Sequence, residues 1–87
     1  MTNYVFVELN NNGTGDDIFF ASEADAVKYA QSEWDKRSAL AKKNMNMFKV
    51  MECEWDSAEE FEAYNEPYSS VELEPHYKRE VKSWLSR

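Results

Sequence analysis

Three carboxylates near the middle of the chain have the spacing that metal or acid–base chemistry requires. Glu52, Glu54 and Asp56 stand at alternate positions, so on an extended strand they share one face. Carboxylates placed in this way hold a divalent cation or act as an acid–base pair. A metal-dependent nuclease also needs a lysine near its acids to handle phosphate, and this stretch has none. We interpret the three acids as a solvated face at a strand end, with no metal and no catalytic role.

Residues 8–17 match the ligand positions and the glycine of a calcium-binding EF-hand loop, through Glu8, Asn10, Asn12, Gly13 and Asp16, but the last ligand is missing. The position where an EF-hand loop has its bidentate acid is Phe19, and the flanking segments have the pattern of strands. A hairpin turn is therefore the preferred interpretation. His76 and Cys53 are the only residues of their types, and no serine or cysteine has an identifiable partner for nucleophilic catalysis. We expect a protein that is not an enzyme and has no cofactor.

Composition predicts one folded domain over residues 1–87. The chain is 43% hydrophobic and 15% aromatic, which is too apolar for disorder and enough for one modest core. The single Cys53 cannot close an intramolecular disulfide, which suggests a reducing cytosol. No apolar run approaches membrane-spanning length, and the N-terminus lacks a secretory signal pattern. We expect a cytoplasmic protein.

Alternation predicts a β-hairpin at the N-terminus. Residues 3–9 have the period of a strand, with Val5 on one face and Phe6 on the other. Residues 10–17 hold both glycines of the chain and several Asn and Asp, so they are suited to the hairpin tip. Residues 18–21 then form a short second strand.

A long helix is expected after the hairpin. Ser22 is a good N-cap, Lys42 and Lys43 stand in the last turn, and Asn44 is a plausible stop. The apolar stripe is rich in alanine, so the helix should lie close against the sheet with Trp34 as its main anchor.

In residues 47–55, side chains again alternate between two faces, and this pattern predicts a third strand. Phe48 and Val50 fall on one face, and Cys53 and Trp55 fall on the other. A short helix should follow through about Tyr64, because Ser57 and the Glu three residues later form a capping box. Three methionines near this strand are expected to fill the core: Met45, Met47 and Met51.

The C-terminal part is expected to hold a loop, a brief extended piece and a last helix. Pro67 and the serines after Tyr68 indicate the loop, and residues 71–73 the extended piece. Pro75 is suited to the first position of a helix whose apolar residues are spaced for one face. These residues are Tyr77, Val81, Trp84 and Leu85.

The resulting prediction is an α+β fold with the order β-β-α-β-α-α. It has a three-stranded antiparallel sheet, a long helix after the hairpin and two C-terminal helices. One face of the sheet would carry Tyr4, Phe6, Phe48 and Val50. Either the last helix covers that face, which we favour, or the face is an exposed apolar patch that binds a partner.

Acidic residues are concentrated between Lys49 and Lys78, where the chain has no Lys or Arg. The nine carboxylates there are Glu52, Glu54, Asp56, Glu59, Glu60, Glu62, Glu66, Glu72 and Glu74. Because the chain totals -7 and this window totals -9, the remainder carries +2. Such a patch attracts a basic protein surface and repels nucleic acid. The alternative is that these acids are only the solvated polar faces of their elements.

Size, acidity and layout resemble small phage-encoded anti-CRISPR proteins and phage DNA mimics. Two stretches carry the resemblance: the hairpin tip running into Ser22-Glu23-Ala24-Asp25, and the acidic-aromatic residues 54–61. In such inhibitors, acidic side chains take the place of DNA on a basic groove. The basic end of the long helix (Lys36, Arg37, Lys42 and Lys43) departs from a uniformly negative mimic.

The resemblance implies a partner-binding surface on the acidic window and, for a phage protein, a location in the host cytoplasm. Its contacting residues would be Glu52, Glu54, Asp56, Glu59, Glu60 and Glu62, with the aromatic anchors Trp55 and Tyr64. The chain would then inhibit a nucleic-acid-binding defence enzyme. The alternative is an interaction module or homodimer joined through the aromatic sheet face, with acids that only solubilise it.

Overall fold

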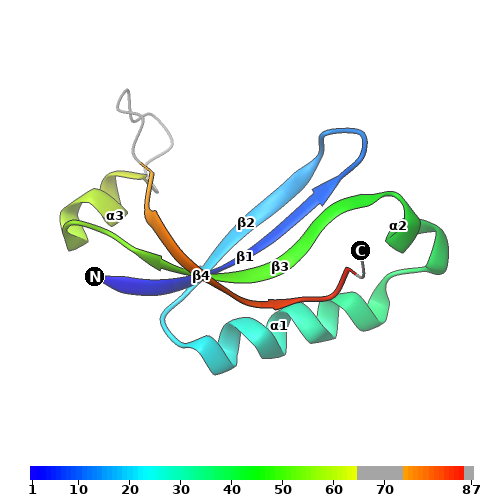
Figure 1. Cartoon of the computed structure of the whole chain (residues 1–87), viewed down its shortest axis with the longest axis horizontal. Helices are drawn as coiled ribbons and strands as arrows, with labels where there is room; N and C mark the ends of the chain where they lie inside the picture. The colour runs from blue at the N-terminus through cyan, green and yellow to red at the C-terminus, as the bar shows by residue number, and fades with distance from the viewer. Residues whose placement is uncertain (65–73, 86–87) are drawn as a thin grey trace.

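The computed structural model describes residues 1–64 and 74–85, which form an α+β fold around one antiparallel sheet (Figure 1). The strands are β1 (Thr2–Asn10), β2 (Gly15–Phe20), β3 (Met45–Glu54) and β4 (His76–Ser83), in the order β2-β1-β3-β4. The helices are α1 (Glu23–Lys36), α2 (Ala39–Lys43) and α3 (Ala58–Tyr64). The predicted α+β class is confirmed, but in the described residues the sheet has four strands and the order is β-β-α-α-β-α-β.

The predicted hairpin is confirmed, with its second strand starting earlier than expected, at Gly15. The tip closes through a hydrogen bond from the Asn10 backbone N–H to the Thr14 carbonyl at 2.8 Å. Gly13 has a φ of 88°, which favours glycine. At Gly15 a Cβ would lie 2.0 Å from the carbonyl oxygen of Glu8, so only glycine lets the two strands approach here.

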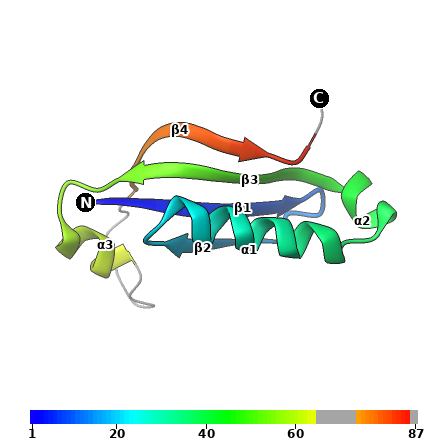
Figure 2. The same ribbon diagram turned by 90° about the horizontal axis from the view of Figure 1, so that it is seen from below.

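Helix α1 packs along one face of the sheet (Figure 2). Ser22 caps it as predicted, because its Oγ accepts from the backbone N–H of Asp25 at 3.1 Å. Ala26 and Ala30 are fully buried, so the small side chains let the helix lie close to the strands.

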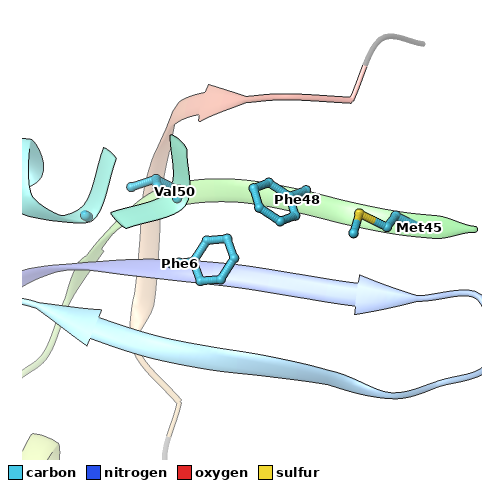
Figure 3. Packing of buried hydrophobic residues seen from close by; sticks show 6 residues of the cluster. Phe6, Met45, Phe48 and Val50 are labelled. Atoms are coloured by element: carbon cyan, nitrogen blue, oxygen red, sulfur yellow. The ribbon is translucent and has the colours of Figure 1, made fainter. Parts of the chain in front are cut away.

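The face beneath α1 is the one that carries the buried aromatic cluster (Figure 3). Phe6 and Phe48 meet edge to face with ring centroids 4.9 Å apart, and Trp34 packs on Phe48 at 5.0 Å. From the sequence we expected either that the last helix covers this face or that the face is exposed. Helix α1 covers it instead, and the opposite face is left for other elements.

The long helix predicted through Lys43 is broken into two. Arg37 ends α1 in an extended conformation, and Ser38 caps α2 by accepting from the backbone N–H of Ala41 at 3.1 Å. The break turns Arg37 onto the sheet, where its Nη2 donates to Glu8 Oε1 at 2.5 Å. A local cap, Ser38, and a distant ion pair, Arg37 with Glu8, both favour this break in the helical pattern.

The predicted last helix is wrong, because His76–Ser83 is strand β4, paired with β3. The register shifts between Val50 and Met51 and again between Glu52 and Cys53, so β4 carries an extra residue at each place. These irregularities break the period of two along β4. Of the four apolar residues that predicted a helix, Tyr77 and Val81 lie on this irregular strand, and Trp84 and Leu85 follow it.

Residues 65–73, which include the predicted loop and brief extended piece, lie outside the described residues. Glu66, Tyr68 and Glu72 of the acidic window lie there too. Among the described helices, none combines the length and apolar character needed to cross a membrane.

Candidate functional site

Helix α3 is held on the face of the sheet opposite α1, at the end where β3 stops. Its start is fixed as predicted, because Ser57 Oγ accepts from the backbone N–H of Glu60 at 3.2 Å. Phe61 and Tyr64 meet Phe19 of β2 edge to face, with centroids 5.7 and 5.4 Å away. Aromatic packing therefore sets the position of the acidic side chains on this helix.

Trp55 lies beneath α3 in the core, with only 2% of its surface exposed. Its Nε1 donates to Asn3 Oδ1 at 3.2 Å, while Asn3 Nδ2 is buried and has no hydrogen-bond partner among residues 1–64 and 74–85. The backbone N–H of Trp55 donates a hydrogen bond to the Met1 carbonyl at 2.8 Å, and the N-terminal ammonium of Met1 donates to the Trp55 carbonyl at 2.9 Å. The structure thus places this predicted anchor in the core beneath α3.

Tyr64, the second predicted anchor, is partly buried against Trp55, with centroids 5.2 Å apart. Burial, together with the negative charges of Asp17 and Glu74, raises the pKa of its hydroxyl. Both aromatic residues named from sequence therefore support the acidic surface from below.

Glu52 is separated from the other predicted acids by its partners. Its Oε1 lies 3.4 Å from Arg79 Nη2 and accepts from the Tyr4 hydroxyl at 3.5 Å. Arg79 also binds Glu23 of α1 at 2.5 Å. The window that has no base in sequence thus receives a base from β4 in space, which Glu52 shares with Glu23.

Five predicted acids remain together in sequence where β3 runs into α3, and we call them the acidic end: Glu54, Asp56, Glu59, Glu60 and Glu62. Among the described residues, the only basic side chain that contacts a carboxylate of this group is His76, whose Nε2 lies 3.2 Å from Asp56 Oδ1. Glu54, Asp56, Glu59 and Glu62 are exposed. Glu59 and Glu60 lie in the first turn of α3, where the helix dipole favours negative charge.

Within the described residues, no group of three or more potential ligands is arranged to hold a metal ion. Glu52, Glu54 and Asp56 are accordingly not brought together as a ligand set. Cys53 is fully buried, and burial raises the pKa of its thiol to about 11, so the thiol is protonated near neutral pH and a poor nucleophile.

Alkaline pH should destabilise the fold through Cys53. The folded pKa of about 11 exceeds the ordinary 9.0, so the unfolded chain loses this proton first. Stability therefore falls as the pH rises from about 9 towards 11, by about 1 kcal/mol at pH 10. Urea unfolding of the wild type and Cys53→Ala at about pH 8 and about pH 10 checks this. The variant should lose less stability between the two pH values, and equal losses would contradict the assignment.

Sequence reasoning missed one surface, the part of the sheet opposite α1 that α3 does not reach. We call it the open face and define it by Val7, Leu9, Met47, Lys49 and Met51. Met45 is in the core as predicted, but Met47 is 39% exposed. The sequence did indicate an uncovered face. Both faces of β1 and β3 carry apolar residues, but only one long amphipathic helix is present to cover a face.

No family model, curated protein or solved structure matches this chain. Its function is therefore argued from its own residues.

Proposed function

We propose that the chain is a non-enzymatic protein that binds a basic, nucleic-acid-binding surface of another protein through the acidic end. The observation that carries the proposal is the scarcity of ion pairs there. Of the five carboxylates, only Asp56 has a basic side chain within 4 Å in the described part of the chain, and that side chain is His76. Acids without Lys or Arg partners, placed where β3 runs into α3, attract Lys and Arg and compete with phosphate for them.

The support beneath α3 favours this use over simple solubility. Trp55, Phe19 and Phe61 form a mutually packed aromatic layer, with centroids 5.5 to 6.0 Å apart. Because this aromatic layer fixes α3 on the sheet, the backbone that carries the acids loses little conformational freedom on binding. The resemblance to phage DNA mimics suggests the class of partner, a defence enzyme that binds nucleic acid.

The competing homodimer cannot use the aromatic face in the form expected from sequence. Phe6, Phe48 and Val50 are at most 1% exposed beneath α1. A salt-insensitive homodimer measured by sedimentation would favour an interaction module over an acidic inhibitor.

Charge reversal at the acidic end should abolish binding without unfolding the chain. Glu59→Lys with Glu62→Lys changes two exposed side chains of α3 and should weaken binding at least about tenfold. The matched control is Asp25→Lys with Asp35→Lys, which makes the same charge change on exposed positions of α1. The partner is captured from host lysate at low salt, identified, and then tested for nucleic-acid binding with and without the chain.

Binding that persists in high salt and in the Glu59/Glu62 variant would contradict the proposal. A partner that still binds its nucleic acid in complex with the chain would contradict the phosphate-mimic mechanism. Circular dichroism of both double variants establishes that each is folded.

A further inference from the structure

The open face spans the two central strands and is flanked by the two edge strands. The register places four residues in one row across the sheet, namely Asp17, Val7, Lys49 and Ser83. The next row towards α3 consists of Phe19, Val5, Met51 and Glu80. Beyond it, Trp55 and α3 cover the sheet. Of the described elements, none packs over the first row from this side.

This face is apolar except for Lys49 of β3, and it is hollowed beside the hairpin tip. The hollow has a volume of about 360 Å³, and its floor includes Val7, Leu9 and Met47. Asp16 and Asp17 of β2 also line it. Apolar side chains are thus left in contact with water next to two carboxylates, as at a surface that binds a partner.

The open face has one cation, Lys49 on β3, and carboxylates on both edge strands, so acids outnumber the base. Asp17 on β2 and Glu80 on β4 flank the face, and neither has an ion pair within residues 1–64 and 74–85. Burial and the neighbouring Asp16 raise the pKa of Asp17, so its negative charge is destabilised as the chain stands. A positively charged group from a partner would relieve this.

We infer that the open face binds an amphipathic helix of another protein, whose apolar stripe is flanked by Lys and Arg. The other face of the same sheet already binds a helix, α1, through Ala26 and Ala30. A second helix would complete a three-layer arrangement. A helix of about 18 residues spans roughly 27 Å, close to the roughly 30 Å of the nine-residue β1.

The sign of the charge argues against a second copy of the chain as the occupant. Each copy carries -7, so two copies repel one another, whereas a basic helix is attracted. The inference rests on the proposed function for the charge of the partner, and it adds a second contact surface and the secondary structure of the bound segment.

The test uses a synthetic peptide of about 18 residues in which leucines form one helical face and lysines flank it. A peptide of the same composition in scrambled order is the control. Amide NMR spectra of the ¹⁵N-labelled chain should shift at Val7, Leu9 and Met51 with the amphipathic peptide. Met47→Lys should weaken this binding at least about tenfold, because it removes an apolar contact and adds a second cation, two residues from Lys49, beneath the basic helix.

Leu40→Lys is the matched control, since Leu40 is an apolar residue of α2 that is 69% exposed. It should bind the peptide like the wild type, and the amide spectra of both variants should remain those of the folded chain. Asp17→Asn should weaken binding about threefold to fivefold, as expected for one partly exposed ion pair.

Four outcomes would overturn the inference. Shifts confined to α3 would leave the acidic end as a binding surface and exclude the open face. Equal binding of the scrambled peptide, or no binding at millimolar concentration, would exclude an amphipathic helix. Shifts at the open face that grow with protein concentration, without peptide, would show that a second copy occupies it.

Discussion

Replacing Trp55 by alanine should destabilise the chain by about 3–5 kcal/mol, as for other large aromatic residues deleted from a core. The indole is 2% exposed, packs on Phe19, Phe61 and Tyr64, and makes its one side-chain hydrogen bond to Asn3. Small domains have only a limited excess of stability, so the variant should be largely unfolded near room temperature. Urea unfolding followed by circular dichroism measures the change.

The control is Trp55→Phe, which retains a ring but removes the N–H that Asn3 Oδ1 accepts. It should be destabilised by about 1–3 kcal/mol, because a buried acceptor is then left unpaired and a small cavity forms. If Trp55→Ala were as stable as the wild type but lost partner binding, Trp55 would be a surface anchor. That result would restore the assignment made from sequence.

The ion pair between Glu8 and Arg37 should show an unequal response to its two single substitutions. The Glu8 side chain is 8% exposed and that of Arg37 is 26% exposed. Arg37→Ala leaves a buried carboxylate without a partner and should destabilise the chain by about 3 kcal/mol or more. Glu8→Ala leaves a guanidinium that reaches water, so its effect should be smaller, about 1–3 kcal/mol.

Lys36→Ala provides the neighbouring control for the ion-pair experiment. Lys36 pairs with Glu33 at 3.3 Å, but its side chain is 69% exposed, so its loss should change stability by less than about 0.5 kcal/mol. The double variant Glu8→Leu/Arg37→Leu should be more stable than Arg37→Ala, because no unpaired charge remains. Chemical unfolding of the four variants gives the order, and a larger effect for Glu8→Ala would contradict it.

Sequence patterns predicted the elements that depend on local signals. The alternation around Val5 and Phe6 gave β1, Ser22 gave the start of α1, and Ser57 gave the start of α3. These signals lie within a few residues of the feature they specify. They survive because the tertiary packing agrees with them.

The features that were missed depend on residues distant in the chain. Strand β4 has an irregular register, which only its pairing with β3 reveals. The end of α1 is favoured in part by Glu8, 29 residues before Arg37. Neither the pairing of β4 with β3 nor the contact between Glu8 and Arg37 can be predicted from local residue propensities.

The candidate site was predicted in part for the same reason. The sequence window identified the acids of α3, but it did not reveal that Arg79 reaches back to Glu52. Nor did it reveal that Trp55 faces Asn3, 52 residues away, in the core. Charge runs are local, whereas ion pairing and burial are properties of the assembled sheet.

The strand order also has a consequence for how fast the chain folds. β1 lies between β2, its neighbour along the chain, and β3, which follows only after both α1 and α2. The hairpin forms by a short local closure, but joining β1 to β3 requires a large loop to close first. Such non-local pairing slows folding relative to helical proteins of this size. We therefore expect the meeting of β1 and β3 to limit the folding rate.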